Sequence, residues 1–235
     1  MSRAIFYIGP SGSGKTTAAR TLNPKSTFVF NALGKDLPWK GSAKQYKYWS
    51  KENTTGNMLK TSNPHTVLTW LDHIDKKLPH VTDIVIDDNT FITSLELLRR
   101  QKETSWDKFT DIAQNFIAIA EKCKTMRDDL IVHILHHTQV EGDGILDDKT
   151  YRAMSYGKLI DEKLGTQEAQ FTIVLRAAKL KKDTGIEYVF YTSDPDSTAK
   201  APMGMFEQET IPNDMDAVSK IVRCYYDEEG CEEIK

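Results

Sequence analysis

The stretch Ala4-Ile5-Phe6-Tyr7-Ile8 runs directly into Gly9-Pro10-Ser11-Gly12-Ser13-Gly14-Lys15-Thr16, and this junction decides the fold. Five apolar residues predict a short buried strand, and the pattern Gly-x4-Gly-Lys-Thr follows where a strand gives way to a helix. Glycines let such a turn curl so that backbone N–H groups point at phosphates. The lysine adds a positive charge that stabilises a transferring phosphate, and the threonine hydroxyl is placed to bind Mg²⁺.

We therefore predict that this turn binds ATP together with Mg²⁺. The chance that a Gly-rich turn matches the full pattern in this context is small. The residues predicted to hold the nucleotide are Gly9, Pro10, Ser11, Gly12, Ser13, Gly14, Lys15, Thr16 and Thr17, with Lys15 also catalytic and Thr16 also a metal ligand.

Apolar runs that predict strands alternate with stretches that predict helices along the rest of the chain. Strands are expected near 27–30, 84–86, 130–135, 171–175 and 188–191, and helices near 64–78, 90–100 and 106–127. Asn63-Pro64 predicts the start of the first of these helices, with Asn63 as its cap and Pro64 at the first helical position. This alternation is typical of an α/β fold with a mainly parallel β-sheet and helices on both faces. Asp183-Thr184-Gly185 predicts a late β-hairpin. Residues 32–62 are polar and irregular, which indicates a surface excursion.

The bulk composition sets further limits. The chain has 235 residues, 39% hydrophobic and 28% charged, and a net charge of −3, so no global charge argues for nucleic acid. No apolar stretch is long enough to span a membrane, and no signal peptide precedes the first strand, so we expect a cytoplasmic protein. One domain is expected over residues 1–226, followed by an acidic, disordered tail over 227–235.

A second acidic feature follows the apolar run Ile84-Val85-Ile86. Magnesium in phosphate sites requires a carboxylate at the end of a neighbouring strand, so Asp87 is the predicted metal residue. Asp88 would face the other side and orient or deprotonate the attacking water. The second strand ends in Asn31 and no glutamate stands at either strand end, so hydrolysis is expected to be slow.

Two further groups are candidate catalytic residues, each with a plainer alternative. His136 and His137 end a strand next to the acidic one and would contact the γ-phosphate, or else are solvated at a strand exit. Arg176 and Lys200 could supply a cation to an adjacent subunit. Alternatively, they belong to a solvated hairpin, which is the interpretation we prefer for Lys179–Lys182.

The order of these motifs resembles a phage-encoded family, the RecA-like ATP-binding proteins of recombination modules grouped with Sak-type single-strand annealing proteins. The likeness extends over residues 3–226 and includes Asp87-Asp88, His136-His137-Thr138, Thr198-Ala199-Lys200-Ala201-Pro202, and the stretch from Trp106-Asp107-Lys108-Phe109 through Tyr156-Gly157-Lys158-Leu159-Ile160-Asp161-Glu162-Lys163.

The resemblance implies a RecA-like P-loop NTPase core and a homo-oligomer, either ring or filament. It also implies single-stranded DNA as partner beside a single-strand binding protein, in the cytoplasm of a bacterial host. The DNA-contacting loop would fall in 139–170, where base stacking and backbone cations come from Tyr151, Arg152, Tyr156 and Lys158. Acidic residues in the same segment reduce its net positive charge.

Two other functions remain open at this point. A nucleoside or nucleotide kinase shares the P-loop but needs an arginine-rich lid, and Arg99, Arg100, Arg127 and Arg152 are scattered along the sequence. A packaging or replication motor, or a loader ATPase, is the other alternative. The preferred prediction is a slow ATPase, stimulated by DNA.

Overall fold

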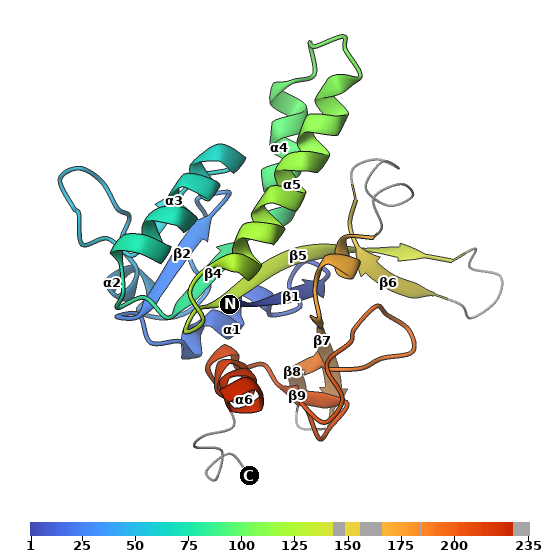
Figure 1. Cartoon of the computed structure of the whole chain (residues 1–235). Helices are drawn as coiled ribbons and strands as arrows, with labels where there is room; N and C mark the ends of the chain where they lie inside the picture. Colours follow the sequence, from blue (N-terminus) through green and yellow to red (C-terminus); the bar gives the residue numbers. More distant parts are fainter. Residues whose placement is uncertain (143–148, 156–165, 184, 228–235) are drawn as a thin grey trace.

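The strand that precedes the Gly-rich turn lies inside a large mixed sheet in the computed structural model shown in Figure 1. The structure describes residues 1–142, 149–155, 166–183 and 185–227. The described strands are β1 (Arg3–Gly9), β2 (Thr27–Asn31), β3 (Met58–Lys60), β4 (Asp83–Asp87), β5 (Ile131–Glu141), β6 (Thr150–Ala153), β7 (Ile173–Lys182), β8 (Gly185–Tyr191) and β9 (Thr210–Pro212). The described helices are α1 (Lys15–Ala18), α2 (Ser42–Gln45), α3 (Pro64–Lys77), α4 (Asn89–Arg99), α5 (Asp107–Thr125) and α6 (Met215–Asp227), with 3₁₀ turns at Ala19–Thr21 and Gln167–Gln170.

The sheet has the order β3-β2-β4-β5-β1-β7-β8-β9, with β6 paired to β5 outside this path. The pairs from β3 to β7 are parallel, whereas β8, β9 and β6 pair antiparallel. Parallel strands end at the same edge, so Gly9 is opposite His137 and Asn31 is opposite Asp87. The predicted α/β class, the mainly parallel sheet and the late hairpin are confirmed.

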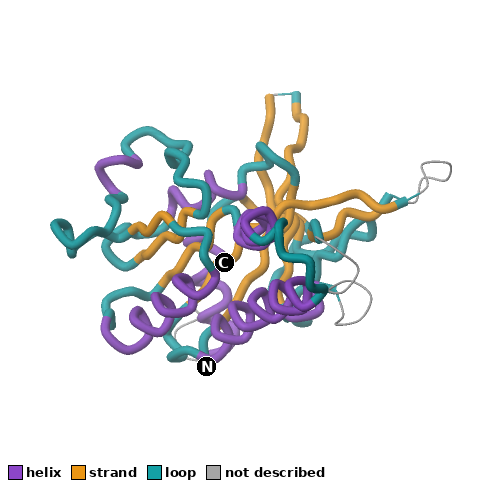
Figure 2. The backbone as a smooth tube through the Cα atoms, turned by 90° about the horizontal axis from the view of Figure 1, so that it is seen from above, coloured by secondary structure: helices purple, strands orange, loops and turns teal. Residues whose placement is uncertain are grey.

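Helices cover both faces of this sheet, and the strands are therefore buried on both sides. Phe6 and Ile8 of β1 face the helices α3, α4 and α5, whereas Ile5 and Tyr7 face α1 and α6. In Figure 1 the green α5 and the red α6 lie on opposite sides of the sheet. Two strand pairs, β5–β6 and β7–β8, project from its body as ribbons (Figure 2).

The start of α3 shows how local sequence sets an element boundary. Asn63 is the N-cap, and its side-chain Oδ1 accepts hydrogen bonds from the backbone N–H of His65 at 2.9 Å and of Thr66 at 3.3 Å. Pro64 takes the first helical position, where its missing N–H costs nothing. The predicted cap is therefore confirmed.

Several predicted boundaries differ from the structure. The strand expected to end at the histidine pair continues to Glu141, because its last four residues pair with β6. Arg176 was expected at the end of a strand but lies within β7, which continues to Lys182. The short edge strands β3 and β9 and the helix α6 were not predicted. The predicted tail falls outside the described residues except for Asp227, which ends α6. No described helix is long and apolar enough to cross a membrane.

A buried polar network joins α6 to the start of β4. The carboxylate of Asp83 accepts a hydrogen bond from the Ser219 hydroxyl at 2.7 Å and one from Arg223 at 3.0 Å. His133 Nε2 lies 3.3 Å from Asp83 Oδ1, and the ring's Nδ1 lies 3.0 Å from the Tyr7 hydroxyl. Burial alone would raise the pKa of Asp83, but His133, Arg223 and Ser219 outweigh it and hold the pKa well below its usual range.

This network predicts an acid-sensitive contribution to stability. Because the pKa of Asp83 is depressed in the folded state, its stabilisation is complete above the unfolded pKa of about 4 and is lost as pH falls below it. Asp83→Asn should lower the free energy of unfolding by about 3 kcal/mol at neutral pH and flatten its decline in acid. Urea unfolding at several pH values measures both effects. The exposed Asp128→Asn should leave the profile unchanged, and an Asp83→Asn profile identical to wild type would contradict the prediction.

Candidate nucleotide-binding site

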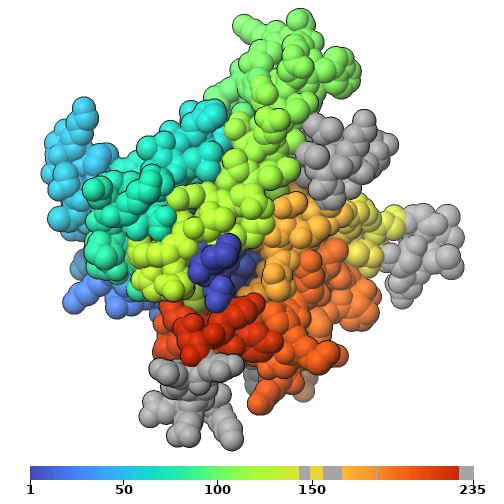
Figure 3. All heavy atoms as spheres, in the orientation of Figure 1, coloured from blue at the N-terminus to red at the C-terminus, as the bar shows by residue number. Residues whose placement is uncertain are grey.

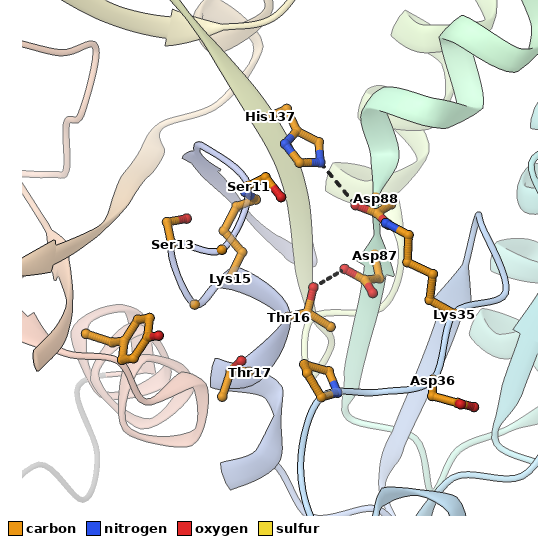
Figure 4. A pocket seen from close by; sticks show the side chains of 14 residues that line it. Ser11, Ser13, Lys15, Thr16, Thr17, Lys35, Asp36, Asp87, Asp88 and His137 are labelled. Carbon is orange, nitrogen blue, oxygen red and sulfur yellow. Dashed lines mark hydrogen bonds and ion pairs between the residues drawn. The ribbon is translucent and has the colours of Figure 1, made fainter. Parts of the chain in front are cut away.

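The turn after β1 borders a cavity of about 300 Å³ at the carboxyl edge of the sheet (Figure 4). The turn itself forms one wall, the ends of β4 and β5 form another, and the loop after β2 forms the third. The residues that line it are Ser11, Gly12, Ser13, Gly14, Lys15, Thr16, Thr17, Lys35, Asp36, Pro38, Asp87, Asp88, His137 and Tyr188. Most of the predicted phosphate-binding residues thus share one cavity with both aspartates and His137.

Glycine is required in the turn for reasons of space and of backbone conformation. A Cβ on Gly9 would lie 2.6 Å from Ser13 Oγ and 2.7 Å from the Ala177 carbonyl oxygen of β7. Gly14 has a φ of 94°, in the left-handed region, and a Cβ there would lie 2.7 Å from the ring of Tyr188. The turn is therefore packed tightly between its own residues and the β7–β8 hairpin.

Lys15 lies at the floor of the cavity, with its charge directed back at the turn. Its Nζ donates to the carbonyl oxygens of Gly9 at 2.6 Å and Pro10 at 3.0 Å. Burial lowers the pKa of Lys15 to about 8, although the charges of Asp88 and Asp87 oppose the shift. Ser13 Oγ is also buried, and it has no hydrogen-bond partner in the described part of the chain. A phosphate group would give both side chains a better acceptor.

Thr16 and Asp87 form the link between the turn and β4. The Thr16 hydroxyl donates to Asp87 Oδ1 at 2.8 Å (Figure 4). Burial, followed by the neighbouring charge of Asp88, raises the pKa of Asp87 to about 6. Mg²⁺ takes oxygen ligands and is usually held by one or two carboxylates or hydroxyls plus substrate phosphates. These two residues fit that donor set, so the cavity has the residues to hold Mg²⁺ beside a triphosphate.

Asp88 is held in an unusual backbone conformation between two basic side chains. Its φ of 57° is the one positive value for a non-glycine residue in the described chain, and it is the N-cap of α4. His137 Nε2 lies 3.2 Å from Oδ1, and Lys35 Nζ lies 3.1 Å from Oδ2. Burial raises its pKa, but the hydrogen bonds and charges of His137 and Lys35 leave the pKa below its usual range. Asp88 lines the same cavity as Asp87.

The two histidines have different surroundings although they are adjacent in sequence. His137 lines the cavity, whereas His136 is buried on the other face of β5 and does not line it. Asn89 Nδ2 lies 3.1 Å from His136 Nδ1, and the His136 Nε2 lies 2.8 Å from the Met154 carbonyl oxygen. Burial lowers the pKa of His136 to about 3. Alternation along a strand explains the difference, since successive side chains point to opposite faces.

The structure does not bring Arg176 and Lys200 to the cavity of their own chain. Arg176 forms an ion pair with Asp194, and its guanidinium lies 4.2 Å from the ring centre of Tyr191 and 4.9 Å from that of Tyr151. Lys200 is exposed on a segment whose backbone pairs with Val174. Their predicted role, as cations supplied to an adjacent subunit, stays a prediction.

Of the four residues predicted to contact DNA, the two that the structure describes do not line this cavity. Tyr151 and Arg152 are on β6, where Tyr151 packs on Arg176 and Arg152 is hydrogen-bonded to Glu141. Tyr156 and Lys158 lie outside the described residues. Glu141, which pairs with Arg152, is one of the acidic residues expected to reduce the positive charge of this loop.

Other residues of the cavity were missed from the sequence. Lys35, Asp36 and Pro38 reach it from the loop after β2, and Tyr188 reaches it from β8. Lys179 is the cross-strand partner of Tyr188, and its Nζ would lie 3.4 Å from a Cβ on Gly12. The predicted hairpin turn is enough to infer that Lys179 and Tyr188 are cross-strand partners. No local sequence signal shows that this hairpin packs against the turn after β1.

Together the fold and this geometry define a P-loop nucleotide-binding site. No protein-family model and no curated protein matches the sequence. Among solved structures, the chain is similar to a KaiC-like protein from the hyperthermophilic archaeon Pyrococcus horikoshii. The two share 13% identity at a TM-score of 0.47, with 80% of this chain and 77% of the other covered. A likeness of this size concerns the backbone alone, so the functional argument rests on the site.

The Thr16–Asp87 pair predicts how Mg²⁺ contributes to ATP affinity as pH changes. Because the raised pKa of Asp87 is about 6, the carboxylate form that favours the metal is lost as pH falls through that value. ATP titrations with and without Mg²⁺ should show the metal-dependent gain shrinking in acid. The terminal phosphate of ATP also titrates, so the effect is measured as the difference between wild type and Asp87→Asn.

Asp36→Asn is the matched control, because Asp36 lines the same cavity but points away from Asp87 (Figure 4). It should keep the metal-dependent gain at neutral pH, whereas Asp87→Asn should lose it by about tenfold or more. An Asp87→Asn protein with an unchanged response to Mg²⁺ would remove Asp87 from the metal site.

Proposed function

We propose that this protein is a RecA-like ATPase that binds ATP with Mg²⁺, hydrolyses it slowly, and assembles on single-stranded DNA in phage recombination, by annealing or strand exchange. The observation that carries the nucleotide part is the hydrogen bond between Thr16 of the Gly-rich turn and Asp87 of β4. The DNA and assembly parts rest on the family resemblance of the motifs. A homo-oligomer in the bacterial cytoplasm, beside a single-strand binding protein, completes the proposal.

The proposed reaction is attack of water on the γ-phosphorus of ATP. A bond forms between the water oxygen and phosphorus as the bond to the β-phosphate oxygen breaks, giving ADP and phosphate. Lys15 stabilises the charge on the phosphates. Asp88 accepts the proton of the water. His137 positions the Asp88 carboxylate, because its Nε2 lies 3.2 Å from Asp88 Oδ1. Thr16 and Asp87 would hold Mg²⁺, which would neutralise negative charge on the phosphates.

Slow turnover follows from the surroundings of Asp88. A general base works best when its pKa is near the working pH, whereas the pKa of Asp88 is lowered by His137 and Lys35. The position at the end of β2 offers no replacement, because the Asn31 side chain bonds the Lys35 carbonyl oxygen at 2.7 Å. The site is thus better arranged to hold ATP than to turn it over rapidly.

The arginines argue against a nucleoside or nucleotide kinase. Arg99 bonds to Ser62, Arg100 pairs with Glu103 and Asp111, and Arg127 bonds to backbone carbonyls such as that of Ile74. None of the described arginines lines the nucleotide cavity. A motor or loader ATPase shares the same site chemistry, and the response to DNA substrates separates it from the proposed recombination protein.

Phosphate release from ATP, measured with and without single-stranded DNA and with added nucleosides, tests the proposal. Wild type should release phosphate slowly and faster with single strands. Lys15→Ala should abolish turnover, and Asp88→Asn should reduce it by about 100-fold, the contribution of a general base. Lys102→Ala, at an exposed position, is the control and should match wild type. A phosphorylated nucleoside product, or turnover that survives Lys15→Ala, would contradict the proposal.

A further inference from the structure

A basic surface segment follows β2, and of its residues only Pro38 lines the nucleotide cavity. Residues 37–51 contain no aspartate or glutamate, although the whole chain has a net charge of −3. Lysines alternate with aromatic residues along it. We name this stretch the Lys–aromatic segment; its cations are Lys40, Lys44, Lys47 and Lys51, and its aromatic residues are Trp39, Tyr46, Tyr48 and Trp49. In Figure 3 the light-blue surface that includes it projects at the left edge of the molecule.

The four lysines of this segment carry charge that no carboxylate neutralises within the described part of the chain. All four are exposed, and none of them forms an ion pair there. Several lysines elsewhere are paired: Lys76 with Asp72 at 2.7 Å, Lys124 with Glu121 at 2.6 Å, and Lys220 with Asp216 at 2.7 Å. What distinguishes the segment is that four exposed lysines lie within twelve residues of sequence that contain no carboxylate. The Lys–aromatic segment is therefore a local site for a polyanion on a chain whose overall charge is negative.

The aromatic residues give the segment a firm base and an accessible ring. Tyr46 is buried, and Trp39 packs edge-on to it while donating from its indole nitrogen to Gln45 Oε1 at 2.9 Å. Trp49 is half-buried and packs edge-on to Trp70 at 4.8 Å. Tyr48, between these anchors, is 40% exposed. A supported, accessible ring among cations is a platform on which an unpaired base can stack.

The geometry points to the Lys–aromatic segment as the surface that binds single-stranded nucleic acid, with phosphates along the lysines and a base on Tyr48. This inference rests on the proposed function and moves its DNA contact away from residues 139–170. Bases of a duplex hide their faces, so stacking selects single strands. An anionic membrane would need more exposed apolar side chains, and Tyr48 is the one large hydrophobic residue of this segment that is exposed.

Hydrogen bonds connect this surface to the nucleotide cavity. Lys35 and Asp36 line both the nucleotide cavity and a second cavity, of about 610 Å³, whose other walls include Tyr46 and Tyr48. The Asn31 amide nitrogen donates to the Lys35 carbonyl oxygen at 2.7 Å and to the Tyr48 hydroxyl at 3.3 Å. Lys35 Nζ in turn lies 3.1 Å from Asp88. A triphosphate that draws Lys35 away from Asp88 would shift the loop that holds Tyr48.

Fluorescence anisotropy of a labelled single strand of about 20 nucleotides, with the full chain, tests this surface. Lys44→Gln/Lys47→Gln should weaken binding about tenfold and reduce the slope of log affinity against log salt by about 1.4, the loss of two phosphate contacts. Lys77→Gln/Lys102→Gln removes the same charge from two exposed positions elsewhere and should bind as wild type does. Equal losses in the two double variants would overturn the assignment.

Two substitutions at Tyr48 separate stacking from coupling. Tyr48→Leu should weaken single-strand binding about tenfold, as loss of one stacked base does. Tyr48→Phe keeps the ring but removes the hydroxyl that bonds Asn31. In wild type we expect ATP to change the single-strand affinity through this loop. Tyr48→Phe should bind single strands as wild type does without nucleotide, and it should not show that response to ATP. Tyr48→Leu with wild-type affinity would contradict the stacking role, and an intact ATP response in Tyr48→Phe would contradict the coupling.

The outcomes distinguish this inference from the proposed function. If wild type binds ATP but no single strand, the DNA part of the proposed function fails and the inference fails with it. If wild type binds single strands and Lys44→Gln/Lys47→Gln matches Lys77→Gln/Lys102→Gln, the surface is wrong and the proposed function stands. Preference for the duplex of the same sequence, or for phosphatidylserine vesicles, would also overturn it.

Discussion

The hydrogen bond from Thr16 to Asp87 is the contact on which the rest of the structure depends. It joins the turn after β1 to the end of β4, and β5 lies between these two strands in the sheet. The parallel register places the ends of β1 and β4 beside His137 of β5, and it thereby brings the turn, the acidic pair and His137 together. The buried strands and the helices on both faces maintain that register, so the fold positions the site rather than merely surrounding it.

The basic side chains of the cavity are hydrogen-bonded to groups of the protein itself, and a bound nucleotide would compete for them. Lys15 is bonded to its own turn, and Lys35 and His137 are bonded to Asp88. A triphosphate offers stronger acceptors to all three groups, so its binding competes with contacts made inside the protein. Because Lys35 and Asn31 are also connected to Tyr48, that competition would extend to the Lys–aromatic segment. Slow hydrolysis would then prolong the bound state.

The sequence allowed prediction of the features that depend on near neighbours. The Gly-rich turn, the acidic end of β4 and the Asn63 cap are each encoded within a few residues. Features that depend on distant partners were missed or misplaced. His136 and His137 were treated as a pair although strand alternation separates them, and Lys35 and Tyr188 enter the cavity from segments whose packing has no local signal. The extension of β5 likewise depends on β6, a separate strand.

A structure of the protein with Mg²⁺ and a non-hydrolysable ATP analogue tests the central claim most directly. We expect the phosphates inside the turn from Gly9 to Thr16, with Mg²⁺ beside the Thr16 hydroxyl and the Asp87 carboxylate. Lys15 Nζ should have left the carbonyl oxygens of Gly9 and Pro10 for the phosphates. A nucleotide bound elsewhere, or Lys15 still bonded to its own turn beside a bound triphosphate, would contradict the account.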